Sequence, residues 1–580
     1  MTREAGGDPR AQLFHTYTTI SRHDPSPREL AAMVLDGRLR LFPHAEVALE
    51  QPFTWREDPL DDANWRFQFH SLVWLDRVRQ AGVELEDDAV LDWYETALRS
   101  WIDANPPVGA PSEYAWFDMA VGLRAVVLAF AVDHLGAQDW LLGALHAHGA
   151  HLADPAHYDE RGNHGLHQDL GLLVAAQLLG REDWVRLGRD RIVTMFEAAI
   201  DEQGVCREGC VDYQYRNYRW YHEALRRLTA AGVTDVTDMG ERLSRMPEFL
   251  AHATAPSGDY ALLGDTLQHS AARIEGTPGD WVRDRTQAPA DHTRVYDSGY
   301  LFSRRRWTTF AEDPENAYLT QRFGPGRATA VHGHEDAGSL TLDAFGETLL
   351  RDSGLYAYEA GDERLYFRGR ASHNVIDVPG RKYYPSAHAD LLALDTDDGR
   401  VFTTVKVVAL QGVVWHRTSL WLPDEQVLLV DDRVRVHGDD TVLQRWQLPE
   451  GSRAQVGADG SEVTITTEAG NVVRVRQHAA PERVVIASGG RQPLDGWVSR
   501  RYREMTPAPA LSFAQHGESV RFTTLISYAD DVDRLTDVRL HRRSAKDLRL
   551  TVGDETEAVG VLVSSDGYTW GGTAPGDLQQ

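Results

Sequence analysis

Two patterns of apolar residues follow one another along the chain. Between about residues 27 and 263, apolar side chains recur three and four positions apart, which is the spacing of an amphipathic α-helix. The expected helices cover 65–80, 87–104, 118–135, 139–152, 166–179, 182–200, 215–231 and 239–255. Because the connections are short and carry Pro or Gly, we expect antiparallel helical hairpins stacked in series, with a groove at one end.

After about residue 277 the period changes to short runs rich in Val, Thr, Leu and aromatic residues, separated by charged or Gly-containing turns. The expected strands include 338–345, 348–352, 401–410, 427–436, 463–467, 472–477 and 519–528. Many short strands without helices between them favour antiparallel sheets packed as a sandwich. We therefore predict a multidomain α+β protein, with a helical domain over 1–275 and a β-sandwich over 290–580. A weaker break near 491 would begin a smaller β subdomain.

The composition and net charge argue against some classes of binding partner. A chain of 580 residues with 42% hydrophobic composition can bury a large core, and its net charge of −27 argues against nucleic acid or a heavily sulfated polyanion. No run of eighteen apolar residues suggests a membrane span, and residues 1–30 lack the pattern of a signal peptide. As given, the chain is expected in the cytoplasm, or in the periplasm or outside the cell if a leader was removed. The chain could also form a homodimer.

The loop before the apolar helix 166–179 carries Asn163 and His164. At a helix N-terminus, backbone N–H groups and the positive end of the dipole favour an anion, so this amide and imidazole could bind a carboxylate. The alternative is that Asn163 only caps the helix. Tyr213 follows a Gly-containing turn just before the helix 215–231, where its side chain could reach a cleft; most tyrosines in such surroundings only pack and hydrogen-bond.

The stretch 331–375 concentrates nitrogen and oxygen ligands in His332, His334, Asp352 and His373. The turn at 345–347 pairs Leu340 approximately with Asp352. If the strand ran on straight, His334 would lie about 20 Å beyond that pair. The glycines at 333 and 338 instead allow the loop to fold back over the sheet.

Two imidazoles and a carboxylate are suitable ligands for Zn²⁺. On spacing alone, a set of hydrogen-bonded core histidines explains the same residues equally well. Three further carboxylates could replace a ligand: Glu335, Asp336 and Asp343. A local positive cluster surrounds His373 and suggests either a carboxylate-binding cleft or an exposed basic face: Arg364, Arg368, Arg370 and Arg381.

Taken together, these residues resemble the heparinase II/III-like polysaccharide lyases. The resemblance is carried by NHGLHQDLGLL, a Glu-x4-Tyr pattern from Glu208 to Tyr213, Gly264-Asp265, HGHEDAGSLTL, RDSG and RGRASHNVIDV. It covers most of the chain and implies an incomplete (α/α) toroid followed by an antiparallel β-sandwich.

The resemblance also implies roles for single residues. Asn163 would bind and neutralise a uronate carboxylate, with His164 beside it. Tyr213 resembles the catalytic tyrosine and His332 the catalytic histidine. The ligands of one structural zinc per chain would be His334, Asp352 and His373, and substrate would also contact Arg368, Arg370 and Tyr215.

Two departures from the family pattern concern the catalytic tyrosine. Many members have Tyr-His where this chain has Tyr213-Gln214, and the proline that often stands two residues before the tyrosine is Val211 here. Tyr215 and Tyr221 therefore remain alternates.

The function implied is a lyase that cleaves 4-linked uronic-acid chains by β-elimination and leaves a 4,5-unsaturated uronate end. Neutralising the carboxylate makes the C5 proton removable, and Tyr213 and His332 would divide the roles of acid and base between them. The catalytic centre is then expected between the two domains. The alternatives are a glycoside hydrolase on a helical toroid, and a non-catalytic protein of glycan binding or exopolysaccharide assembly.

Overall fold

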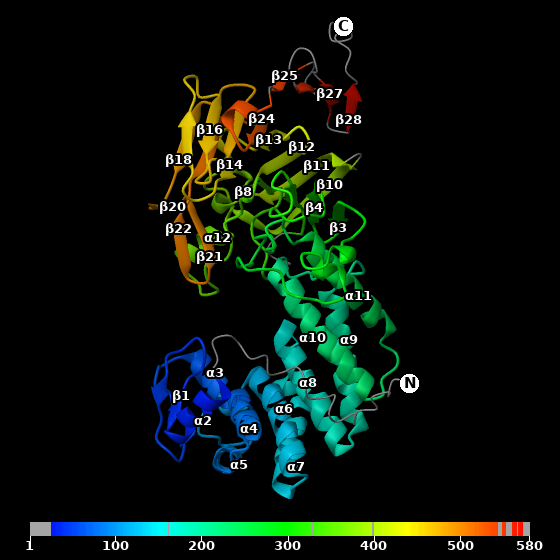
Figure 1. Cartoon of the computed structure of the whole chain (residues 1–580), viewed down its shortest axis with the longest axis vertical. Helices are drawn as coiled ribbons and strands as arrows, with labels where there is room; N and C mark the ends of the chain where they lie inside the picture. Colours follow the sequence, from blue (N-terminus) through cyan, green and yellow to red (C-terminus); the bar gives the residue numbers. More distant parts are fainter. Residues whose placement is uncertain are drawn as a thin grey trace. The chain divides into compact units, whose positions relative to one another are not determined.

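The computed structural model describes residues 25–160, 162–325, 330–396, 399–536, 538–542, 548–552, 559–564 and 567–571. Helices occupy the first part of the chain and strands the rest (Figure 1). Nearly all of the segment weighed for a signal peptide lies outside these residues. In the described ranges, no helix is long and apolar enough to cross a membrane.

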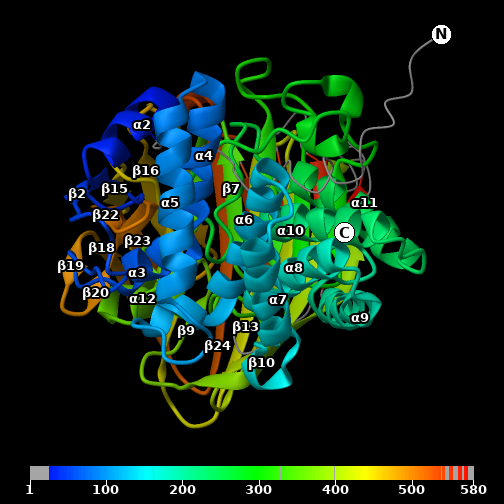
Figure 2. The same cartoon turned by 90° about the horizontal axis from the view of Figure 1, so that it is seen from below.

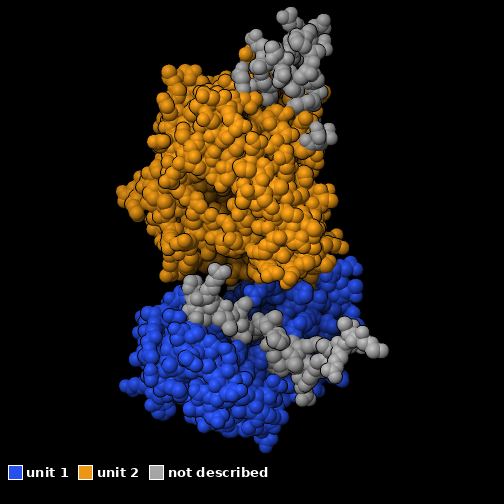
Figure 3. Space-filling model, in the orientation of Figure 1, with its two compact units in different colours: residues 1–199, 219–241 blue, residues 200–218, 242–580 orange. Residues whose placement is uncertain are grey.

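The chain divides into two compact units (Figure 3). Unit 1 contains residues 1–199 and 219–241, and unit 2 contains residues 200–218 and 242–580. The sequence predicted one boundary, between 275 and 290. In the structure the chain instead passes between the units after residue 199 and then within two helices, at 218–219 and at 241–242. The helix that carries Tyr213 is one of these.

Unit 1 is built from helices. They are α2 (Pro27–Leu35), α3 (Ala63–Ser71), α4 (Val73–Leu85), α5 (Asp88–Ala104), α6 (Asp118–Leu135), α7 (Asp139–Ala153), α8 (Gly162–Leu179) and α9 (Glu182–Ala199), with parts of α10 (Val211–Ala230) and α11 (Thr237–His252). The short strands β1 (Arg38–Leu39) and β2 (Val47–Ala48) pair beside α2. A large buried cluster that includes Trp65, Phe69 and Trp101 forms the core.

Glycines set the distance between α6 and α8, which lie side by side (Figure 2). A Cβ atom added to Gly122 would come within 2.1 Å of the His167 carbonyl oxygen, and one added to Gly171 within 2.6 Å of the Gly122 Cα. Since only glycine allows this approach, the two positions fix α8, and with it the first turn that carries Asn163 and His164.

The single helix expected over 65–80 is wrong, because the structure has α3 and α4 with Leu72 between them at a φ of 59°. The Phe69 carbonyl accepts a hydrogen bond from Trp74 Nε1 at 3.0 Å, and the His70 carbonyl accepts one from Arg124 Nη1 at 2.6 Å. Side chains thus take carbonyls that would otherwise accept the helical hydrogen bonds. The α-helical period continues across the break, so the sequence pattern does not reveal it.

Unit 2 contains antiparallel sheets, as predicted. One has the order β3 (Thr293–Tyr296), β4 (Tyr300–Arg304), β5 (Ala317–Arg322), β7 (Leu340–Ala344), β8 (Glu347–Leu350). A larger one has the order β15 (Arg453–Val456), β16 (Glu462–Thr466), β17 (Val472–Gln477), β24 (Ser519–Ala529), β13 (Val427–Val436), β12 (Val413–Leu422), β11 (Val401–Leu410), β10 (Tyr383–Asp395), β6 (Gly324–Pro325). A third has the order β18 (Arg483–Ala487), β23 (Ala510–His516), β14 (Thr441–Gln447), β9 (Ile376–Asp377). One buried apolar cluster joins all three sheets.

The break expected near residue 491 stays a prediction. Two small hairpins lie there, β19 (Gly490–Arg491) with β20 (Leu494–Asp495) and β21 (Trp497–Arg501) with β22 (Glu504–Pro507). The chain then returns to the main sheets, since β23 pairs with β14 and β24 lies between β17 and β13. A further sheet follows, formed by β25 (Val538–Arg542), β26 (Leu548–Val552), β27 (Val559–Val563) and β28 (Tyr568–Gly571). Local periodicity cannot report which distant strands pair, so the sequence did not predict this return to the main sheets.

Candidate active site

The loop 331–339 folds back over the sheet, as expected from its glycines. It contains no strand, and β7 begins only at Leu340. Phe345 and Gly346 form the tight turn with positive φ values of 53° and 86°, and Leu342 pairs with Leu350. The ladder stops there, because β8 ends at Leu350 and the Asn374 side chain donates to the carbonyls of Leu340 and Arg351, so the expected pairing of Leu340 with Asp352 is not part of it.

Three backbone segments meet tightly at this loop. A Cβ atom on Gly264 would lie 2.4 Å from the Gly209 carbonyl oxygen and 2.7 Å from the His332 carbonyl oxygen. One on Gly209 would lie 2.9 Å from the Gly333 Cα. Hydrogen bonds fix the junction, from the His332 N–H to the Glu208 carbonyl at 2.8 Å and from the Asp265 N–H to the His332 carbonyl at 2.9 Å. Glycine at 209 and 264, both with positive φ, therefore allows segments far apart in sequence to share one site.

Tyr213 and His332 are brought together at this junction. Their rings stack with centroids 3.6 Å apart and planes inclined by 16°. Tyr213 lies in the first turn of α10, not in a loop before it, because α10 begins at Val211. Thr266 Oγ1 accepts hydrogen bonds from the N–H groups of Val211 at 3.1 Å and Asp212 at 3.4 Å. A cap supplied from so far along the chain cannot be read from local sequence.

A second tyrosine, which sequence reasoning missed, joins this pair. The hydroxyl of Tyr358 is hydrogen-bonded to that of Tyr213. Its ring lies edge-on to His332 at 5.8 Å, and the residue is 43% exposed. Burial raises the pKa of Tyr213, while the hydrogen bond with Tyr358 acts to lower it. Nothing in its local sequence distinguishes Tyr358 from the neighbouring Tyr356.

The Asp265 carboxylate lies under the histidines and is completely buried. It accepts hydrogen bonds from Arg364 at 2.5 and 2.7 Å, from His332 Nδ1 at 3.0 Å and from His334 Nε2 at 2.9 Å. Burial alone would raise the pKa of this carboxyl, but the hydrogen bonds from Arg364, His332 and His334 hold it well below its usual value. Asp265 is therefore ionised. Sequence reasoning noted it only as half of a Gly-Asp motif.

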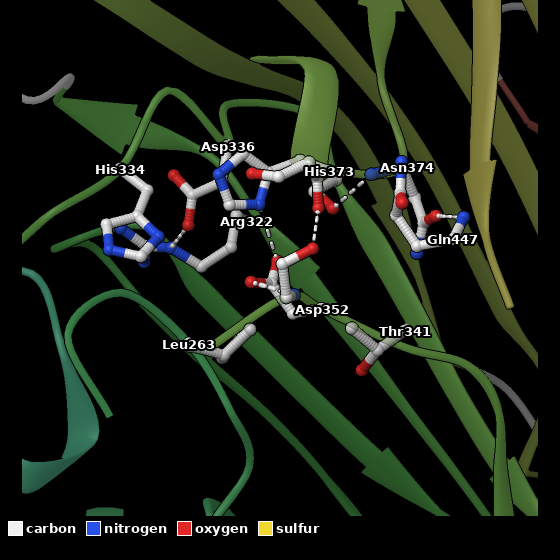
Figure 4. Close-up of polar contacts among 12 residues, drawn as sticks. Leu263, Arg322, His334, Asp336, Thr341, Asp352, His373, Asn374 and Gln447 are labelled. Atoms are coloured by element: carbon white, nitrogen blue, oxygen red, sulfur yellow. Dashed lines mark hydrogen bonds and ion pairs between the residues drawn. The ribbon is translucent and has the colours of Figure 1, made fainter. Parts of the chain in front are cut away.

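His334, Asp352 and His373 form a buried group that can hold a metal ion (Figure 4). One potential ligand atom from each lies within 4.8 Å of the others, and His373 Nδ1 is 2.8 Å from an Asp352 oxygen. Among the described residues, His334 Nδ1 and His373 Nε2 have no hydrogen-bond partner although both are buried. Orphaned ring nitrogens beside a carboxylate are the donor set that a divalent cation would satisfy.

The electrostatics of two of the three members suit metal binding. The pKa of His373 is instead raised, because the Asp352 carboxylate outweighs the lowering by burial, and a metal would have to displace that proton. Burial lowers the pKa of His334, which favours the neutral ring that a metal requires. For Asp352, the neighbouring His373 outweighs the effect of burial, so the pKa falls below its usual value and the carboxylate is ionised. Of the alternative carboxylates, Asp336 instead pairs with Arg322 at 3.3 Å (Figure 4).

The arginines expected to bind substrate have other partners. Arg370 is only 4% exposed and donates to the Ile376 carbonyl at 2.8 Å, so its surroundings give no support to the expected substrate contact. Arg368 donates to the carbonyls of Val331 and Gly333 at 3.1 and 3.0 Å, which fixes the loop that carries His332. Arg381 pairs with Asp440 and lies outside this cluster. The closeness of these arginines to His373 in sequence did not indicate which groups their guanidinium ends would contact.

The expected substrate contact of Tyr215 receives no support from its surroundings. The ring packs against an apolar cluster that includes Val211, Phe249 and Tyr260. Arg216, which sequence reasoning did not select, is exposed, and its guanidinium lies 5.4 Å from the centre of the Tyr213 ring. Its position three residues after Tyr213 on a helix was the available signal.

Asn163 and His164 belong to unit 1, in the first turn of α8. Asn163 thus lies inside the helix and does not precede it as a cap. His164 Nδ1 is bonded to the Asp118 carboxylate at the start of α6, and the His164 side chain is 42% exposed. Asp118, Asp159 and His164 form a second, more exposed group of potential ligands.

Comparison with known proteins identifies relatives of both halves of the chain. Residues 33–283 match the family model described as heparinase II/III N-terminus, and residues 288–529 match the one described as heparinase II/III-like, C-terminal. No curated protein matches the sequence.

Several solved structures share the fold. The heparan sulfate lyase HepC from Pedobacter heparinus is 16% identical with a TM-score of 0.74, over 97% of this chain and 92% of that one. A structure of heparinase III is also 16% identical with a TM-score of 0.74, over 96% and 95%. A mutant of the chondroitin AC lyase of Streptomyces coelicolor A3 is 13% identical with a TM-score of 0.54, over 96% and 94%. The predicted toroid followed by a β-sandwich is confirmed.

Proposed function

This chain belongs to the heparinase II/III-like family of polysaccharide lyases, and we propose that it cleaves 4-linked chains of unsulfated or lightly sulfated uronic acids. Lyases of this kind break a carbon–oxygen bond by β-elimination, so the new end carries a 4,5-unsaturated uronate. The observation that carries the proposal is the Tyr213–His332 stack, with Asp265 holding the imidazole. It sets two groups capable of proton transfer side by side.

Elimination requires a base for the C5 proton and an acid for the leaving oxygen on C4. Tyr213 and His332 supply these two roles in the proposal. Because burial raises the pKa of Tyr213, its phenol keeps its proton near neutral pH, which suits donation to the leaving oxygen. His332 then accepts the C5 proton.

The C5 proton is only weakly acidic until the neighbouring carboxylate is neutralised. We assign this neutralisation to Asn163 and His164, on the resemblance to the family and on the helix N-terminus that bears them. The bond with Asp118 orients the His164 ring.

The metal in this proposal is one structural Zn²⁺ per chain, held by His334, Asp352 and His373. The buried N, N, O donor set with two orphaned ring nitrogens supports it. When bound, the ion would tie the loop that carries His332 to the residues after β8, and it takes no part in proton transfer.

The preference for few sulfates rests on the arginines. Arg364, Arg368 and Arg370 are engaged by Asp265 or by backbone carbonyls, whereas Arg216 is exposed beside Tyr213. A densely sulfated chain would need several such cations in a protein whose net charge is −27. We assign Arg216 to binding an anionic group of the substrate.

A screen of uronate polymers and oligomers tests the proposal. Elimination raises the ultraviolet absorbance of the product through its C4–C5 double bond, and the rise should be greatest with unsulfated chains. New reducing ends without the absorbance would indicate a hydrolase instead, and binding without cleavage would indicate a non-catalytic protein. The cytoplasmic location and the homodimer stay predictions.

A further inference from the structure

One carboxylate contacts both functional histidines of the loop 331–339. Asp265 Oδ2 lies 3.0 Å from His332 Nδ1, and Oδ1 lies 2.9 Å from His334 Nε2. His332 belongs to the stacked pair with Tyr213, and His334 belongs to the metal-binding group. The two imidazoles are therefore oriented by opposite oxygens of one side chain.

Arg364 and the backbone fix this carboxylate. The guanidinium bonds both oxygens, at 2.5 and 2.7 Å, and the Asp265 N–H donates to the His332 carbonyl at 2.9 Å. A buried carboxylate with such partners stays ionised and accepts hydrogen bonds only. Whichever nitrogen of each ring faces Asp265 must therefore carry the proton.

We propose that Asp265 is a positioning residue that holds His332 as its Nδ1–H tautomer and holds His334 for the metal with the same carboxylate. His332 Nε2 is then the atom that exchanges a proton with substrate, and His334 Nδ1 is the atom left for the metal. The second part matches the orphaned state of that nitrogen among the described residues. The first part of the inference rests on the proposed lyase activity, and the second part rests on the proposed metal site.

Another carboxylate also lies near His332, so the geometry must distinguish the two. Glu208 lies 3.5 Å from Nε2 and accepts a hydrogen bond from Asn217 at 2.9 Å. Asp265 is nearer to the ring, is completely buried and accepts four hydrogen bonds from three side chains. It is therefore the stronger constraint on the tautomer of His332. Such hydrogen-bonded partners of a metal-binding histidine also tune metal affinity.

The main test is Asp265→Asn, an isosteric change that removes the charge and can present a donor to one ring. With zinc saturating, we expect kcat to fall about 100-fold or more, as when an orienting aspartate is lost from a histidine, while KM stays within about threefold. Zinc affinity should fall about 10- to 100-fold. The matched control is Asp431→Asn, which removes another buried carboxylate of unit 2 that an arginine, Arg521, bonds at both oxygens. It should lower stability and leave kcat unchanged.

A double-mutant cycle separates positioning from a general structural role. If Asp265 acts through His332, then Asp265→Asn should cost little further activity in a His332→Ala background. An equal loss in both backgrounds, or wild-type kcat in Asp265→Asn, would overturn the proposal. Because the zinc titration needs no turnover, it still tests the second part if the wild-type protein proves inactive as a lyase.

The tautomer can also be read in the unaltered protein, should Asp265→Asn fail to fold. Nitrogen-15 spectra of histidine-labelled protein, with the His332 signals assigned by their loss in His332→Ala, should show Nδ1 protonated at neutral pH. A ring protonated at Nε2 alone would refute the assignment whatever the kinetics.

Discussion

The rings of Tyr213 and His332 lie parallel with centroids 3.6 Å apart, one on the first turn of α10 and the other on the loop before β7. Neither element orients its residue alone. Thr266 caps α10, and the neighbouring Asp265 holds His332. The segment 264–266 thus fixes both halves of the pair, which is why we expect catalysis to depend on it.

Tyr213→Phe and His332→Ala should each reduce the rise in ultraviolet absorbance on the true substrate to a small residual rate, because each removes one of the two groups that transfer protons. Circular dichroism should show both variants folded. Tyr215→Phe is the control, since that ring packs in an apolar cluster, and it should retain activity. Full activity in both site variants would exclude the assignment.

Tyr358→Phe should lower kcat by about three- to tenfold, the effect of losing one hydrogen bond of ordinary strength to the Tyr213 hydroxyl. Steady-state kinetics measures the change, and KM should move little. Tyr528→Phe provides the comparison, because its hydroxyl accepts a hydrogen bond from Trp421 Nε1 in the buried core of unit 2. Equal losses in the two variants would argue against a specific role for Tyr358.

Metal analysis of freshly purified protein should find one zinc per chain. Asp352→Asn and His373→Ala should each lose the zinc and lower the melting temperature. Each variant leaves buried polar atoms unsatisfied and removes the link between the metal and the loop 331–339. Intact activity in wild-type protein without metal would contradict the ligand set. Asp336→Asn, which removes a carboxylate paired with Arg322, should keep the zinc.

Arg216→Met should raise KM about tenfold, the loss of roughly one charge-assisted hydrogen bond to an anionic substrate, with less change in kcat. Arg216→Lys should recover part of the loss by keeping the charge. Arg381→Met is the matched control, since Arg381 pairs with Asp440 away from the site. An unchanged KM in Arg216→Met would place the substrate elsewhere.

Stability should fall as the pH rises between about 4 and 7, in part because of Asp343. Burial raises the pKa of this carboxyl from 3.8 to about 7. In that window the folded protein holds a proton that the unfolded chain has released, so raising the pH favours unfolding until both are ionised. Asp343→Asn should therefore flatten the fall of melting temperature between pH 5 and 8. A parallel curve for wild type and variant would contradict the shifted pKa.

Sequence alone determined the classes of the elements and named most of the candidate site residues. The helical period through 263, the strand runs after 277 and the fold-back at Gly333 and Gly338 are all local features, because each depends on which face of one element is buried or on the backbone freedom of one residue. The resemblance then supplied Tyr213, His332 and the three metal-binding residues.

Only the tertiary structure decided how those residues work together. Asp265 and Tyr358 join the candidate site through contacts with segments far apart in the chain. The structure also shows that Arg216 lies beside the Tyr213 ring and that Arg370 is bonded to a backbone carbonyl. The close approach at Gly209 and Gly264 and the capping of α10 by Thr266 create these contacts. Periodicity records only whether a side chain is buried, and it carries no information on which remote donor or acceptor that side chain meets.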